Sequence, residues 1–97
     1  MSSVTINLSS MSNEKQPIPH LMMVDRFIAL ANEFVKTETK ERVSSAMLYA
    51  ASRFNAFEAS SKSSHLAKDK MDALNWYSAE YRRMLDSNLD EMIEMQS

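Results

Sequence analysis

The sequence contains no glycine, and this absence restricts the folds open to the chain more than any other feature. Phosphate-binding loops, dinucleotide-binding turns and nucleophile elbows need backbone with positive φ or without a Cβ atom, which glycine supplies in nearly all of them. Two-residue β-hairpins lose their preferred turn residue for the same reason. Because alanine, leucine, methionine, glutamate and lysine are plentiful, the composition predicts an all-α protein and excludes those enzyme classes.

Size and charge narrow the choice further. A chain of 97 residues forms one domain at most and buries only about 60–65% of its unfolded surface. We therefore expect a thin core, and we expect oligomerisation to stabilise the fold by burying further surface. The formal net charge of −2 argues against a general attraction to nucleic acid or anionic membranes. The sequence has no run of about 18 apolar residues, no signal-peptide pattern and no cysteine. We therefore expect a cytoplasmic protein that contacts neither nucleic acid nor membrane.

The first part of the chain differs from the rest in composition. Residues 1–18 are rich in serine and other polar residues and lack helical periodicity. This pattern predicts a disordered N-terminal tail, followed by a helical bundle domain over residues 19–97. Val4, Ile6 and Leu8 alternate with polar residues as in a strand, but so short a strand has no partner here, and the tail is the preferred interpretation.

Three later segments repeat apolar residues at helical spacing. They predict an antiparallel three-helix bundle with helices over residues 19–36, 40–60 and 65–95. Pro19 suits the first position of a helix, where its missing N–H costs nothing. The middle helix is the central element, because it carries little charge on any side and is expected to be covered on more than one. Its predicted core face consists of Val43, Ala46, Met47, Ala50, Phe54 and Phe57.

Candidate capping residues stand before the second and third helices. Thr37 or Thr39 can cap the second helix, and Ser64 can cap the third. Ser87, followed by acidic residues, also resembles the start of a new helix. Two alternatives therefore stay open: a continuous third helix, or a break near residues 86–88 that gives a short fourth helix.

Three runs of sequence carry a resemblance to a known family. They are DRFIALANE at residues 25–33, VSSAMLYAASRFNAFEAS at residues 43–60 and YRRMLDSNLDEMI at residues 81–93. Together they resemble a small, mostly proteobacterial, all-helical family catalogued as a domain of unknown function, over about residues 25–95. The resemblance implies a short helical protein of the cytoplasm and supplies no catalytic residues.

The titratable residues form no recognisable catalytic or metal-binding pattern. His20 and His65 are the only histidines, and neither has the spacing that places two ligands on one helical face. The carboxylates are mostly interleaved with lysine or arginine, which is typical of a solvated surface. We therefore expect no metal, no cofactor and no catalysis.

One polar cluster gives an alternative function. Arg42, Tyr49 and Arg53 lie in a row beside the apolar face of the second helix, and Glu58 lies on the other margin. Arginine side chains can hold a carboxylate or phosphate group, although pairing with acids of a neighbouring helix is the favoured interpretation. The alternative function is binding of a small anionic or apolar ligand between helices near Tyr49, Arg53 and Glu58.

The principal hypothesis rests on apolar residues outside the expected core. Trp76 lies away from the inward line of the third helix, and Leu89, Met92 and Ile93 lie beyond the reach of the second helix. Exposed large apolar residues mark interfaces, where tryptophan is enriched, although the tail or the first helix is an alternative cover for Trp76. We expect a small homo-oligomeric interaction or adaptor module, most simply a dimer, with an unidentified protein partner as a further option.

Overall fold

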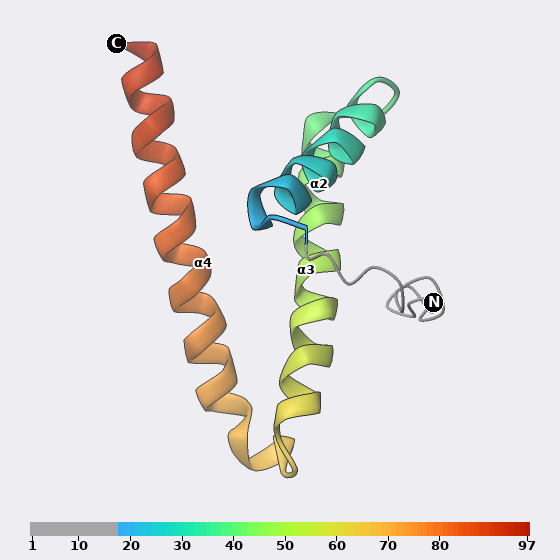
Figure 1. Ribbon diagram of the computed structural model, residues 1–97, viewed down its shortest axis with the longest axis vertical. Coiled ribbons are helices and arrows are strands. Elements are labelled where there is room, and N and C mark those ends of the chain that lie inside the picture. The colour runs from blue at the N-terminus through green and yellow to red at the C-terminus, as the bar shows by residue number, and fades with distance from the viewer. Residues whose placement is uncertain (1–17) are drawn as a thin grey trace. The chain divides into compact units, whose positions relative to one another are not determined.

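The computed structural model describes residues 18–97 and shows an all-α protein of three helices (Figure 1). These are α2 (His20–Val35), α3 (Lys40–Lys62) and α4 (Leu66–Gln96). No strand occurs within residues 18–97. The predicted fold class is confirmed, and every helix end lies within two residues of its predicted position. The predicted tail lies outside the described residues, apart from Ile18, which is exposed.

The chain divides into two compact units, with the boundary inside α3. The first unit ends at Phe54 and contains α2 and the first part of α3. The second begins at Asn55 and contains the last two turns of α3 and all of α4. Within each unit a short link reverses the chain, so that consecutive helical segments run antiparallel (Figure 1).

Pro19 precedes α2 and does not form its first residue. Its ψ of 141° is extended, and its carbonyl oxygen accepts hydrogen bonds from the backbone N–H groups of Met22 at 2.9 Å and Met23 at 3.2 Å. The expectation that Pro19 is the first helical residue is therefore wrong by one position. Its fixed φ of −53° still prepares the entry to the helix.

The link after α2 ends the helix without a residue in the left-handed region. The backbone N–H groups of Lys36, Thr37 and Glu38 donate to carbonyl oxygens in the last turn of α2, and no residue of 18–97 has positive φ. The hydroxyl of Thr39 then accepts the N–H of Arg42 at 3.1 Å. Of the two threonines left open by the sequence, Thr39 caps α3.

The start of α4 uses a different serine from the one expected. His65 occupies the cap position and makes no side-chain cap hydrogen bond. Ser63 Oγ accepts the backbone N–H of His65 at 3.1 Å and donates to Asp69 Oδ2 at 2.7 Å. The prediction that Ser64 caps this helix is therefore wrong, because the serine hydroxyl that stabilises the link is one residue earlier.

Helix α4 runs without a break through residues 86–88. Of the two alternatives, the continuous helix is correct, and the described residues contain no short fourth helix. Nothing in this segment stops a helix, because it has neither proline nor glycine, and serine and aspartate are only mildly unfavourable inside one. At about 1.5 Å per residue, α4 is about 46 Å long.

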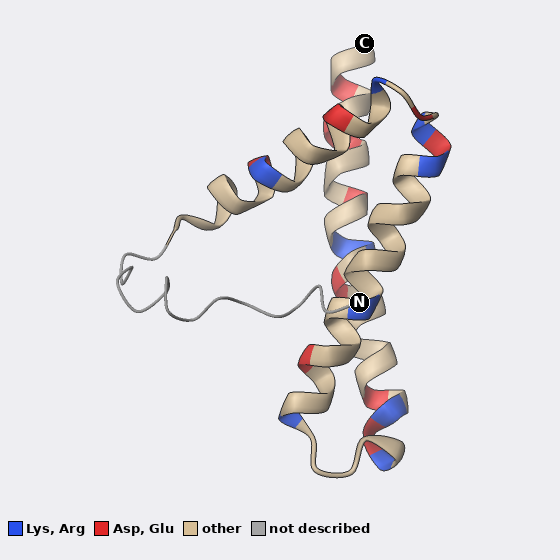
Figure 2. Cartoon of the chain, turned by 90° about the vertical axis from the view of Figure 1, so that its right-hand side faces the viewer, with Lys and Arg blue, Asp and Glu red and all other residues tan. Residues whose placement is uncertain are grey.

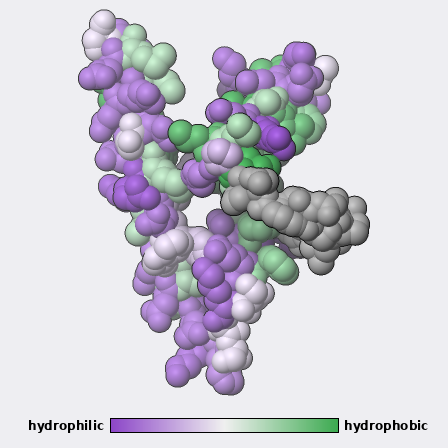
Figure 3. All heavy atoms as spheres, in the orientation of Figure 1, coloured by the Kyte–Doolittle hydropathy of each residue, from purple (hydrophilic) through white to green (hydrophobic). Residues whose placement is uncertain are grey.

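Very little apolar surface is buried. Val43, at 7% exposure, is the only buried residue among those described, and α2 and α4 contain none. Phe54 and Phe57, predicted as core, are about half exposed at 52% and 51%. Hydrophobic residues are visible on the surface of the first unit in Figure 3. The predicted core face is therefore confirmed only at Val43, because a pair of helices meets along a single line and leaves most of each apolar face uncovered.

Val43→Ala is expected to lower the free energy of unfolding by about 1–2 kcal/mol, since it removes buried methyl groups but gains some helix propensity. The matched control is Leu48→Ala in the same helix, where the side chain is exposed and the expected loss is smaller. Urea denaturation followed by circular dichroism measures both. Equal losses would contradict the assignment of Val43 to the core.

Thr39→Ala is expected to cost about 1 kcal/mol, because the N–H of Arg42 loses its acceptor at the start of α3. Thr37→Ala, two residues earlier in the same link, removes a hydroxyl that makes no cap bond and is expected to be nearly neutral. Thermal melts of the two variants compare them directly. A Thr37→Ala variant that is the less stable of the two would reverse the assignment.

Candidate functional site

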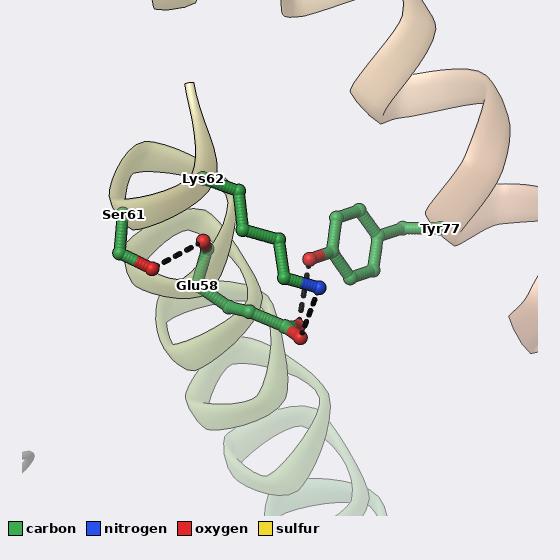
Figure 4. Close-up of polar contacts among 4 residues, drawn as sticks. All are labelled: Glu58, Ser61, Lys62 and Tyr77. Atoms are coloured by element: carbon green, nitrogen blue, oxygen red, sulfur yellow. Dashed lines mark hydrogen bonds and ion pairs between the residues drawn. The ribbon is translucent and has the colours of Figure 1, made fainter. Parts of the chain in front are cut away.

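A polar cluster connects the two helical segments of the second unit. Tyr77 Oη on α4 donates a hydrogen bond of 2.7 Å to Glu58 Oε1 on α3 (Figure 4). Lys62 Nζ, one turn later on α3, lies 3.1 Å from Glu58 Oε2. Glu58 thus uses one carboxylate oxygen for each partner, and its backbone carbonyl accepts the hydroxyl of Ser61 at 2.7 Å.

These contacts shift the ionisation of both central groups. The hydrogen bond from Tyr77, supported by Lys62, holds the pKa of Glu58 below its ordinary value against the smaller opposing effect of burial. The same hydrogen bond raises the pKa of Tyr77, because the carboxylate accepts the phenolic proton and repels a phenolate. The cluster therefore favours an ionised glutamate and a neutral tyrosine.

The chemistry of this cluster is that of a structural contact. Glu58 and Tyr77 are half-buried, and both carboxylate oxygens of Glu58 are already paired. A lowered glutamate pKa and a raised tyrosine pKa both move away from neutral pH, where a general acid or base works best. The sequence analysis singled out Glu58 but not its partner Tyr77, which lies 19 residues later on another helix.

Two of the predicted ligand residues border a shallow, open concavity in the first unit. Its volume is about 400 Å³, and it is lined by Glu41, Arg42, Ser45, Ala46 and Tyr49. The ten residues after Arg42 on α3 carry no charge, as the uninterrupted tan stretch of that helix in Figure 2 shows. The concavity therefore has one charged end and an uncharged wall.

Arg42 already has an acidic partner next to this concavity. Its Nη1 lies 2.9 Å from Glu38 Oε1, and the two side chains are 77% and 41% exposed. The sequence favoured an acidic partner on a neighbouring helix. The partner, Glu38, instead belongs to the link before α3. An exposed pair of this kind contributes little to stability.

The structure does not bring the whole predicted ligand cluster to one place. Tyr49 lies at the concavity, but Arg53 and Glu58 are not among its lining residues. Arg53 is exposed and belongs to the first unit with Tyr49, whereas Glu58 belongs to the second unit and faces Tyr77. Ligand binding near these three residues stays a prediction.

The predicted interface residues also separate into two groups. Trp76, Leu89, Met92 and Ile93 are all more than half exposed. On a continuous helix at about 100° per residue, Leu89 and Ile93 lie within about 100° of Met92, whereas Trp76 lies about 160° from it. The ring of Trp76 stands edge-on to that of its neighbour Tyr77, with centroids 5.0 Å apart. One flat contact on α4 therefore cannot include both Trp76 and Met92.

Two other kinds of site are absent from residues 18–97. No group of three histidine or acidic side chains is placed to hold a metal ion. None of the helices described combines the length and the apolar character needed to cross a bilayer.

The sequence matches a family model described as "Protein of unknown function (DUF3144)" over residues 20–93. The chain belongs to the DUF3144 family. The match begins with α2 and ends near the end of α4, so it includes nearly all of the helical part of this DUF3144 chain. It confirms the resemblance to a family of unknown function that the three sequence runs indicated. No curated protein and no solved structure matches the chain.

In this DUF3144 protein, Tyr77→Phe is expected to raise the pKa of Glu58 towards its ordinary value, because the largest cause of the depression is removed. A group with a lowered folded-state pKa stabilises the fold above its unfolded pKa and loses that contribution as the pH falls through the folded one. The wild type should therefore exceed the variant in stability at neutral pH, with the difference narrowing in acid.

Carbon-13 NMR titration of the Glu58 carboxyl group measures the pKa directly. Tyr81→Phe, one turn later and exposed, serves as the matched control and should leave the Glu58 titration unchanged. An identical Glu58 pKa in wild type and Tyr77→Phe would show that the hydrogen bond does not persist in solution.

Proposed function

We propose that this DUF3144 protein is a small homo-oligomeric interaction module without catalysis, and that its basic assembly is a dimer. It works in the cytoplasm of a bacterial cell and contacts neither nucleic acid nor membrane. The absence of cysteine and the small net negative charge are compatible with this location and with these partners.

One observation carries the proposal. Among the described residues, 25 large hydrophobic side chains are exposed, whereas Val43 alone is buried. Monomeric proteins rarely expose contiguous apolar patches of more than a few hundred Å², and larger patches mark interaction sites. A chain with so little internal burial gains most from covering these side chains with another surface.

A second copy is the simplest source of that surface. Most soluble homo-oligomers are closed, and two-fold dimers are the commonest form. Every residue from Tyr81 to Ser97 is exposed, so the last turns of α4 offer a long surface for such a contact. Leu89, Met92 and Ile93 lie within it. A short helical interface of this kind is expected to give a dimer that dissociates on dilution.

Met92→Glu is expected to shift the protein towards monomer while keeping its helical content, because a buried interface rejects an unpaired charge. Ser87→Glu places the same charge on the same helix about 140° away and should leave assembly unchanged. Sedimentation equilibrium over a range of concentrations measures the species present. A wild-type protein that stays monomeric at several hundred micromolar would refute self-association.

Trp76→Glu in the same experiment examines the other side of α4. A shift to monomer would place Trp76 in a second self-contact, and an unchanged dimer would leave its ring for a different protein partner.

A further inference from the structure

We infer that the side of α4 around Trp76 binds a protein partner that presents a segment rich in arginine or lysine. This inference goes beyond the proposed self-association and does not depend on it. The surface, called the Trp76 face below, consists of Trp76 and the charged residues of α4 that lie within about 60° of it around the helix. These residues are Asp69, Asp72, Glu80, Arg83, Asp90, Glu91 and Glu94.

Charge is distributed unevenly around α4. Six of its seven acidic residues lie on the Trp76 face, and only Asp86 lies outside it. Of the four basic residues of the helix, Arg83 alone lies on this face. The whole chain has a formal net charge of −2, whereas the six acids and one arginine give this single face a formal charge of −5. A positively charged surface is therefore the electrostatic complement of this side of the helix.

Most of these carboxylates lack a positive partner within residues 18–97. Glu80 Oε1 lies 2.8 Å from Arg83 Nη2, and Asp69 Oδ2 accepts the hydroxyl of Ser63. The other four acids are exposed and form no ion pair with any described residue: Asp72, Asp90, Glu91 and Glu94. Like charges four residues apart on a helix repel each other, as Asp90 and Glu94 do here. A cationic partner would remove this repulsion.

Trp76 gives the face a specific contact point. The residue is 59% exposed, and its ring meets that of Tyr77 edge-on with centroids 5.0 Å apart. Lysine and arginine side chains bind over the face of an aromatic ring, and tryptophan is the best of the three rings for this contact. Asp72 and Glu80 lie one turn to either side of Trp76, so a cation at the ring also lies near carboxylates. This combination favours a cationic side chain over an apolar one.

The length of the face indicates a segment of protein and not a small cation. At 1.5 Å per residue, the distance along α4 from Asp69 to Glu94 is about 38 Å. A small cation would cover one or two carboxylates of this length. An extended segment of about 12 residues, or a helix of about 25, would reach from one end to the other.

Fluorescence of Trp76 tests the inference directly, because it is the only tryptophan in the chain. The full-length protein is titrated with an oligo-arginine peptide, which contributes no fluorescence, and the emission is expected to change until it saturates. Added salt should move the midpoint to higher peptide concentration, since screening weakens the attraction. An oligo-glutamate peptide of the same length should have little effect, as should free arginine at the same total arginine concentration.

Two variants that change the net charge equally locate the binding surface. Asp72→Asn removes a carboxylate one turn from Trp76, whereas Ser78→Lys adds a positive charge to the same helix about 160° from Trp76. Asp72→Asn is expected to weaken peptide binding about two- to fivefold, as for loss of an exposed ion pair. Ser78→Lys should weaken it less. Circular dichroism verifies that both variants keep their helical content.

Three outcomes of the titration would overturn the inference. They are an emission spectrum that oligo-arginine leaves unchanged, equal weakening by the two variants, which would show a response to net charge alone, and free arginine that acts as well as the peptide. All three would leave self-association through Met92 intact, since sedimentation measures it separately. Dissociation of the dimer by Trp76→Glu would place a second copy on the Trp76 face and would also overturn the inference. A monomeric wild type that binds oligo-arginine would refute self-association and support the Trp76 face.

Discussion

Hydrogen bonding within each helix, and not a shared apolar core, determines the form of the described chain. Three helices account for most of residues 18–97, yet Val43 is the only side chain that they bury. Helices in water are marginal at the 16 residues of α2 unless an apolar face is packed against something. The links between the helices also depend on local contacts, since Thr39 and Ser63 stabilise them through hydrogen bonds to nearby residues. The physical case for self-association of this DUF3144 protein follows from that imbalance between helix content and burial.

The sequence predicted the helices well because the signals for them are local. Apolar spacing and the lack of glycine are properties of neighbouring residues, and they placed all helix ends within two residues. The errors were also local. Ser64 was chosen as a cap where Ser63 makes the hydrogen bonds, and Ser87 looked like a new start. A capping residue can begin a helix only where the preceding one stops, and nothing stops α4 at that point.

The core and the polar cluster were harder to predict because they depend on which helix faces which. Periodicity showed that Phe54 lies on an apolar face, but it could not show that this face stays half exposed. The same periodicity places Glu58 at the edge of that face. Its partner Tyr77 is 19 residues away on another helix, and no sequence pattern links the two. The hydrogen bond to Lys62 was the predictable part, because residues four apart on a helix are neighbours.

The separation of Trp76 from Met92 around α4 affects how many contacts the protein can make at once. A two-fold pair formed through Met92 would be closed, because each copy would cover the contact surface of the other. Trp76 lies about 160° from Met92 around the helix and would remain outside such a pair. Self-association through Met92 and binding of another protein through Trp76 would then use opposite sides of one helix, so a substitution on either side can disable one contact without removing the other.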